Sequence, residues 1–326
     1  RQCLSDPDIF DQERFCHSLA KLVSAALTAE GGDVLPEDRQ NSEEFLRTLA
    51  GDSDTAFTLE NPTPVIRRSG IEYLGNLRSL QIGTNSSSAF HTLVLAQVAS
   101  DAPGVTETAI EAYLKNTPEM GVAELANTIE TDYNGHQAAA VQMVARLGQA
   151  AYIEGNSAQW KEALQDGQLI SALMTVAGDE AQNEEIRTDA ISAIGHTRTG
   201  NVDSAGLLLN ILIDADRSLE MRLAAAYALG NIAAVHGAVL EGLEAELINI
   251  VLNDEEPSEP RVVTAYALSK FDDNNEVIKA LSRSQRMEIA NTLVQLYGEV
   301  EAEPPTGNDL VISPNTQKAL ILYALG

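Results

Sequence analysis

The sequence predicts an all-α protein, an α-solenoid built from helix–turn–helix units. A segment that pairs a basic residue with small residues and a final Leu-Gly recurs along the chain at a period near 35 to 40 residues. Such a period with helical spacing is typical of stacked helical repeats. The composition agrees, because 44% of the residues are hydrophobic but only 5% are aromatic, which favours packed helices over a β-sandwich.

The first part of the chain, residues 1–53, carries helical patterns at 8–29 and 43–50 but no repeat register. We expect it to form an N-terminal helical cap. It holds the two cysteines of the chain, Cys3 and Cys16. An arm folded back along the first helix would bring them within bridging range, and a disulfide would suit a periplasmic or secreted protein. The alternative is a cytoplasmic protein with two buried free thiols.

The repeats are aligned on a basic residue near the start of a helix. Counted from it, a small residue comes three positions later, Leu or Ile seven positions later, and Gly or Ser eight positions later; position three of the last copy, Ile321, is larger. The aligned basic residues are Arg67, Arg187, Arg222, Arg261 and Lys318. Small residues at these offsets predict that neighbouring helices approach closely, with the Leu or Ile filling a shared core.

The spacing of these copies defines the array. Arg187 and Arg222 are 35 residues apart, Arg222 and Arg261 are 39 apart, and the 120 residues from Arg67 to Arg187 fit three periods. A leucine-rich helix precedes the copies at 203–214 and 239–252. We therefore assign residues 54–326 to the repeat array.

The register at Arg67, Arg187, Arg222 and Arg261 resembles that of HEAT-like repeats, particularly those of phycobilisome-lyase-type repeat proteins. The resemblance implies a ladder of Asp–Arg pairs that ties neighbouring repeats together. Charge supports the same expectation, because an arginine at a helix start opposes the helix dipole and needs an acidic partner. A solvated arginine is the alternative. The candidate ladder or binding carboxylates are Asp214, Asp216, Asp254, Glu255, Asp272 and Asp273.

The C-terminal part departs from the repeat. The 57 residues from Arg261 to Lys318 are too many for one period, and the excess falls in an acidic, proline-containing loop at 298–314. The last helix ends at Gly326 with an apolar face and no polar cap. We expect either further domains of a longer polypeptide or a partner that covers this end.

The charge balance restricts the partners. The chain has 48 Asp and Glu against 21 Lys and Arg, a net charge of −27. Such a surface disfavours nucleic acid and anionic membranes, and no apolar run approaches the ~18 residues that would span a bilayer. A basic protein partner fits this charge; solubility alone, a cation or a saline habitat would also account for it.

No catalytic motif, metal-ligand spacing or cofactor fingerprint is recognisable, and the five histidines are scattered. The acidic segment 271–278 could hold calcium but lacks EF-hand spacing, so a capped turn explains it better. Tyr73, Tyr227 and Tyr266 could line a groove, although packing explains them better. We therefore expect a non-enzymatic scaffold that binds a basic protein. The alternative is a module that handles small molecules, either lyase-like or lipid-handling.

Overall fold

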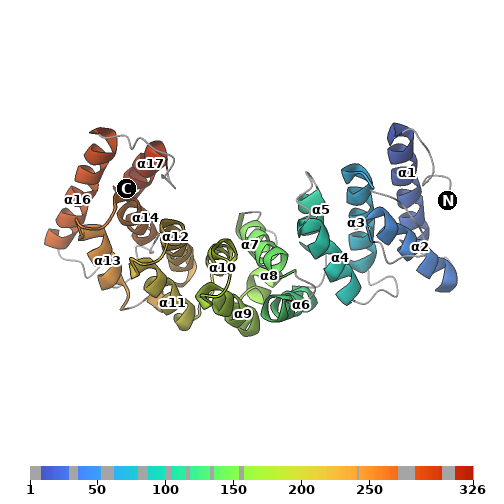
Figure 1. The fold of residues 1–326 in the computed structure, drawn as a ribbon, viewed down its shortest axis with the longest axis horizontal. Helices are drawn as coiled ribbons and strands as arrows, with labels where there is room; N and C mark the ends of the chain where they lie inside the picture. The colour runs from blue at the N-terminus through green and yellow to red at the C-terminus, as the bar shows by residue number, and fades with distance from the viewer. Residues whose placement is uncertain are drawn as a thin grey trace. The chain divides into compact units, whose positions relative to one another are not determined.

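The computed structural model describes most of the chain, and every regular element in the described residues is helical. The described ranges are 9–28, 36–52, 62–79, 87–99, 105–114, 118–132, 136–153, 158–240, 242–270, 283–302 and 313–325. An all-α fold is thus confirmed for this part of the chain (Figure 1). The chain separates into two compact units, Arg1–Leu147 with Ser157–Ala163, and Gly148–Asn156 with Leu164–Gly326.

Unit 1 contains the expected N-terminal helices. Its helices are α1 (Ile9–Thr28), α2 (Pro36–Leu49), α3 (Pro64–Ser79), α4 (Ser87–Ala99), α5 (Val105–Leu114), α6 (Pro118–Thr131), most of α7 (Gln137–Ile153) and α8 (Ala158–Ala163). The second N-terminal helix begins earlier than expected, at Pro36, a residue suited to a first helical turn. Helices α1 and α2 both pack on α3, so the segment expected to form a cap contacts the first helix of the repeat pattern.

Close backbone approach shapes this contact. A Cβ atom on Gly70 of α3 would lie only 2.4 Å from the backbone nitrogen of Ala50, next to the end of α2. No side chain fits at that distance, so glycine lets the two backbones touch. The small residue expected three positions after Arg67 therefore has the packing role that the pattern indicates.

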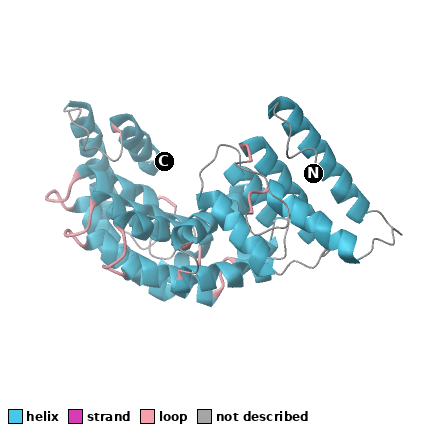
Figure 2. Cartoon of the chain, turned by 45° about the vertical axis from the view of Figure 1, so that its right-hand side comes forward, coloured by secondary structure: helices cyan, strands magenta, loops and turns pink. Residues whose placement is uncertain are grey.

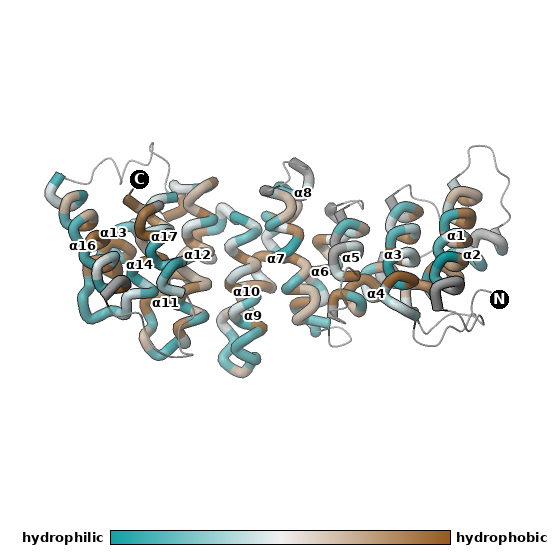
Figure 3. The backbone as a smooth tube through the Cα atoms, turned by 90° about the horizontal axis from the view of Figure 1, so that it is seen from above, coloured by the Kyte–Doolittle hydropathy of each residue, from teal (hydrophilic) through white to brown (hydrophobic). Residues whose placement is uncertain are grey.

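Unit 2 is a succession of paired helices. They are α9 (Gly167–Gly178), α10 (Glu184–Thr197), α11 (Val202–Ile213), α12 (Leu219–His236), α13 (Glu244–Leu252), α14 (Ser258–Leu268), α16 (Arg283–Ala302) and α17 (Pro314–Leu325). Each of the pairs α9–α10, α11–α12 and α13–α14 packs together, and the second helices α10, α12 and α14 pack on one another in order. Buried apolar residues such as Ile191, Leu208 and Leu229 lie in these helices, whose hydrophobic stretches are brown in Figure 3.

Glycine contacts set the distance between the second helices. A Cβ on Gly195 of α10 would lie 2.5 Å from the Cα of Ala228 on α12. A Cβ on Gly230 of α12 would lie 3.0 Å from the Cα of Ala267 on α14. The residue eight positions after each arginine thus packs against the residue six positions after the next arginine, which confirms the predicted role of these small residues.

Helix α12 together with the following 3-10 turn, Leu219–Leu240, is long and apolar enough by length and composition to cross a membrane, although no uninterrupted apolar run of that length occurs. Half of its apolar window is buried in the fold. Contacts with α10, α11 and α14 account for this composition, because a helix that packs on several sides is apolar all round.

The expected loop at 298–314 is shorter in the structure. Helix α16 continues to Ala302, and α17 begins at Pro314, so residues 298–302 are helical. Helix-forming residues such as Glu299 and Ala302 extend the helix past Gly298. Residues 303–312 lie outside the described residues.

Candidate functional site

The turns inside the three helix pairs of unit 2 share one backbone design. In each turn the first residue (Asp179, Asp214 or Asn253) accepts a hydrogen bond from the backbone N–H two residues later, over 3.0, 3.0 and 3.1 Å. Its carbonyl oxygen accepts a second bond from the N–H three residues later, over 3.1, 3.1 and 3.3 Å. Asp and Asn favour this turn because their side chains reach the backbone two residues on. The three turns therefore present their following residues in the same way.

The arginine of each pair ties the second helix back to the first. Arg187, Arg222 and Arg261 are each the fourth residue of their helix and are 5 to 7% exposed. Each donates from Nε to the backbone carbonyl ten residues earlier, and these acceptors are Ala177 at 3.3 Å, Leu212 at 2.8 Å and Val251 at 3.1 Å. The guanidinium group thus satisfies a carbonyl in the last turn of the preceding helix.

This geometry changes the expected role of the arginines. We expected carboxylates as partners because arginine opposes the dipole of its own helix; instead, each arginine reaches the negative end of the preceding helix, where a cation is stabilising. Asp214 does not hydrogen-bond Arg222, although Arg222 helps lower the pKa of its carboxyl. Arg222 does have an acidic partner, Glu256 of the next turn, with Nη2 and Oε1 2.5 Å apart.

Arg67 and Lys318 depart from this arrangement. Arg67 donates from Nη1 to Oε1 of Gln97 on α4, over 3.3 Å. The ammonium group of Lys318 lies 5.6 Å from the centre of the Tyr297 ring. The buried fourth residue of α17 is Gln317, only 1% exposed, whereas Lys318 follows it as the fifth residue. The helix begins one residue too early for Lys318 to occupy that position.

Ion pairs link neighbouring turns. Arg217 lies 2.7 Å from a carboxylate oxygen of Glu180 in the preceding turn and 3.0 Å from Asp214 in its own turn. The pKa of the Asp214 carboxyl is lowered, chiefly by the hydrogen bond from the Asp216 backbone N–H and then by Arg217. Sequence reasoning missed Glu180, Arg217 and Glu256, although their position in equivalent turns could have indicated them.

The turns form a strongly acidic edge. We call the exposed carboxylates of the three turns the acidic edge, and its members are Asp179, Glu180, Asp216, Asp254 and Glu255. Residues 164–270 hold 17 Asp and Glu against six Arg and Lys, and three of the six are the buried arginines. The turns lie along one side of unit 2 (Figure 2), so their charges accumulate there. The candidates Asp272 and Asp273, and the possible calcium segment 271–278, lie outside the described residues.

Unit 1 contains a buried polar chain of a different kind. His91 Nδ1 contacts the hydroxyl of Tyr113, and His91 Nε2 lies 3.0 Å from Thr128 Oγ1. The Thr128 hydroxyl donates to the carbonyl of Glu124 over 2.9 Å, so it accepts from His91. The imidazole therefore carries its proton on Nε2, and Tyr113 donates to Nδ1.

Burial makes this histidine a weak base. His91 is 4% exposed, and desolvation, with a smaller contribution from His136, lowers its pKa to about 4. Burial also raises the pKa of the Tyr113 hydroxyl well above its ordinary value. His91, Tyr113 and Thr128 are all buried, and their contacts join α4, α5 and α6 through neutral partners.

The remaining candidates are distributed over both units. Tyr227 and Tyr266 contact edge to face with ring centres 5.9 Å apart, while Tyr73 lies in unit 1 with its ring 5.9 Å from that of His17. Cys16 is buried and Cys3 lies outside the described residues, so the disulfide stays a prediction. Within the described ranges, no cluster of three His, Cys, Asp or Glu could hold a metal ion.

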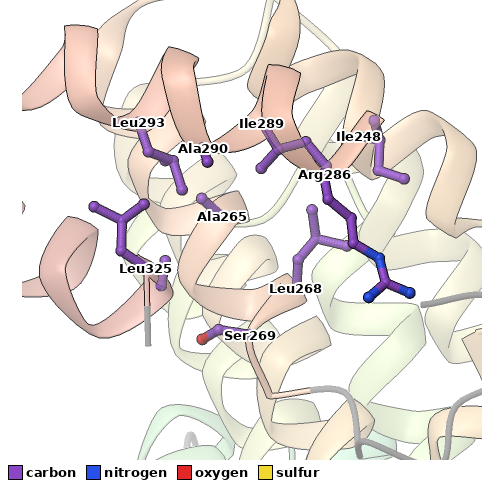
Figure 4. A pocket seen from close by; sticks show the side chains of 10 residues that line it. Ile248, Ala265, Leu268, Ser269, Arg286, Ile289, Ala290, Leu293 and Leu325 are labelled. Atoms are coloured by element: carbon purple, nitrogen blue, oxygen red, sulfur yellow. The ribbon is translucent and has the colours of Figure 1, made fainter. Parts of the chain in front are cut away.

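An apolar cavity of about 290 Å³ lies in unit 2 between α13, α14, α16 and α17. Leu268, Ile289 and Leu293 contribute to its wall, and polar lining comes from Arg286 and Ser269 (Figure 4). Nothing in the sequence pattern indicated this cavity, because helices from three separate segments enclose it.

Comparisons with known proteins assign no family. No protein-family model matches the chain, and no curated protein does. A crystal structure of an engineered protein from a structural genomics consortium is similar over 82% of this chain and 93% of its own, at 16% identity and a TM-score of 0.36. A likeness of this size carries no argument about fold or function.

Proposed function

We propose that the protein is a non-enzymatic scaffold whose acidic edge binds a basic segment of another protein. The observation that supports this most is the repeated turn, which has the same backbone design in three successive helix pairs and carries at least one exposed carboxylate in each. Few cations offset this charge: Arg187, Arg222 and Arg261 are buried against backbone carbonyls, and Arg217 pairs with Glu180. A lysine- or arginine-rich partner would therefore meet a surface with an excess of negative charge.

We further propose that the helix pairs belong to a HEAT-like α-solenoid. The support is the recurrence of the same turn and the same arginine-to-carbonyl bond at intervals of 35 and 39 residues, and of the same glycine contact after 35 residues. Repeats that contact only their neighbours create an extended surface, and this is the property that a scaffold uses.

A binding measurement tests the proposal. A fluorescent lysine-rich peptide is titrated with the full chain by anisotropy, at low salt and at high salt. We expect affinity that falls steeply with salt, because the attraction comes from exposed charge. In a variant with D179N, E180Q, D216N, D254N and E255Q, affinity should fall at least tenfold.

A matched control separates the acidic edge from net charge. E288Q and E299Q, together with D166N, D203N and E220Q, remove as many charges outside the edge. The proposal requires this control to bind like wild type. Equal losses in both variants would show that the peptide responds to overall charge, and would contradict an edge-specific site.

Small-molecule handling is a second candidate function, and the apolar cavity favours its lipid-handling form over the lyase-like one. No observation adds support for a chromophore-lyase role. Export to the periplasm or beyond is proposed on the cysteine pair alone, and cytoplasmic location remains the alternative. Peptide mapping under non-reducing conditions tests this. A Cys3–Cys16 crosslink supports export, and its absence supports the cytoplasmic alternative.

A further inference from the structure

The cavity between α13, α14, α16 and α17 combines two kinds of surface. Its wall is mostly aliphatic, with Ile248, Leu268 and Leu293 facing the same space from three helices. Arg286 adds a permanent positive charge. Figure 4 shows its side chain extending from α16 past Leu268, with the guanidinium group at the edge of the apolar cluster. An apolar interior with a cation at one edge selects a ligand of matching polarity.

The size of the cavity limits that ligand. Its volume of about 290 Å³ is roughly twice that of a ~150 Å³ apolar cavity that accommodates benzene. The occupant therefore has on the order of a dozen non-hydrogen atoms. This is at the small end of the range for ligand pockets in proteins.

We propose that this cavity binds a medium-chain carboxylate, with the alkyl chain against the aliphatic wall and the carboxylate paired with Arg286. Arginine fits a carboxylate through two parallel hydrogen bonds. The Ser269 hydroxyl already donates its proton to the carbonyl of Tyr266 over 2.6 Å. It therefore has no proton left to donate to the carboxylate, which leaves Arg286 as the donor. This site is separate from the acidic edge and does not depend on the scaffold function.

The rest of the surface opposes such a ligand. The net charge of −27 repels anions, so a carboxylate gains no general attraction to this chain. Saturable binding of a fatty acid would then report a site that combines apolar contact with a local cation.

Calorimetric titration of the full chain with decanoate, well below the concentration at which it forms micelles, tests the proposal. We expect one site per chain, and affinity that rises about fourfold per methylene from hexanoate to decanoate and levels off with longer chains. Decanol, which lacks the charge that would pair with the exposed Arg286, should bind about threefold more weakly. Affinity that keeps rising through hexadecanoate, or decanol that binds as tightly as decanoate, would overturn the assignment.

Two variants locate the site. Ala290→Phe places a ring in the cavity from a partly exposed position and should abolish binding. Because Arg286 is exposed, Arg286→Gln should weaken binding of decanoate about threefold and leave binding of decanol unchanged. Arg283→Gln, on the same helix but outside the cavity lining, is the matched control and should bind like wild type. Circular dichroism verifies that each variant is folded, and unchanged decanoate binding in a folded A290F or R286Q variant would refute the proposal.

Discussion

The two units satisfy buried polar groups with different chemistry. In unit 2, arginines donate to carbonyls at the ends of the preceding helices, and each bond involves a permanent charge. In unit 1, two deeply buried links are neutral: Gln137 donates to the carbonyl of Ile129 over 2.7 Å, and His91 joins Tyr113 to Thr128. Helix contacts of similar kind can therefore be stabilised with or without charge.

This difference has consequences for pH and for stability. Arginine keeps its charge at every accessible pH, so the arginine-to-carbonyl links in unit 2 do not titrate. The link through His91 depends on a neutral imidazole, which an acidic medium protonates. Unit 1 should therefore be the unit that responds to mild acid.

The largest expected effect is the loss of stability of unit 1 in mild acid. The pKa of His91 is about 4 in the folded protein, against an unfolded value of about 6.5. Because the unfolded state binds the proton more readily, stability is complete above pH 6.5 and falls as the pH drops toward 4. The free energy of unfolding that is lost over this range is about 3 kcal/mol.

Fluorescence measures this effect in unit 1 alone. The single tryptophan, Trp160, is buried in unit 1, with its ring 6.3 Å from that of Tyr113. Urea unfolding followed by Trp160 emission at pH 7 and at pH 4.5 gives the change. His136 and Glu124 are nearby titratable groups, so the H136Q variant serves as a control that should keep most of the pH dependence. Equal midpoints at both pH values would contradict the account of His91.

The glycine contacts in unit 2 predict the next effect. Gly195→Ala places a methyl group 2.5 Å from the Cα of Ala228, and such overpacking costs about 2–3 kcal/mol. Gly206→Ala, where no atom lies within 4 Å, is the matched control on α11. It should stabilise the helix by about 0.5–1 kcal/mol. Urea unfolding followed by circular dichroism measures the unfolding midpoint of each variant. A shift of both midpoints in the same direction would contradict this packing.

The charged and neutral links can be compared directly. Arg187→Met keeps much of the apolar stem but removes the bond to Ala177, and we expect a loss of about 2 kcal/mol, as for hydrogen bonds that involve a charge. Gln137→Leu removes the neutral bond to Ile129 and should cost about 1 kcal/mol. Hydrogen exchange measures each loss of stability locally, in α9 and α10 for Arg187→Met and in α6 and α7 for Gln137→Leu. A larger loss of stability for Gln137→Leu than for Arg187→Met would contradict this ranking of charged and neutral links.

The smallest effect is expected at the ion pairs between turns. Arg217 is partly exposed and Glu180 is 74% exposed, so Arg217→Gln should cost less than about 1 kcal/mol. The loss should shrink further in high salt. Thermal unfolding at two salt concentrations measures it, and a loss comparable to that of Arg187→Met would mean that the turns depend on this pair far more than its exposure indicates.

Much of the fold was predictable because it depends on side-chain size at fixed spacing. The register at Arg187, Arg222 and Arg261 identified buried positions, and Gly195 and Gly230 marked close helix contacts. The acceptors of the arginines were not predictable, since main-chain carbonyls leave no residue signature. Charge selected Lys318 in the last copy, whereas the structure has Gln317 as the buried fourth residue of α17.

The sites depend on contacts that spacing does not reveal. His91 meets Tyr113 and Thr128, 22 and 37 residues away, on two other helices. The cavity requires helices from separate segments of unit 2 to enclose one space. By contrast, the acidic edge was partly foreseen, because Asp216, Asp254 and Glu255 lie in turns that the sequence marks with Asp, Asn and Pro.

Hydrogen–deuterium exchange of the full chain, with and without a saturating lysine-rich peptide, tests the proposed binding edge most directly. The turns carry defined backbone N–H groups at Ala181, Asp216 and Glu255. The account predicts slower exchange at all three turns when the peptide is bound at low salt, and recovery of the free rates at high salt. Protection confined to unit 1 or to α16, with the three turns unchanged, would contradict it.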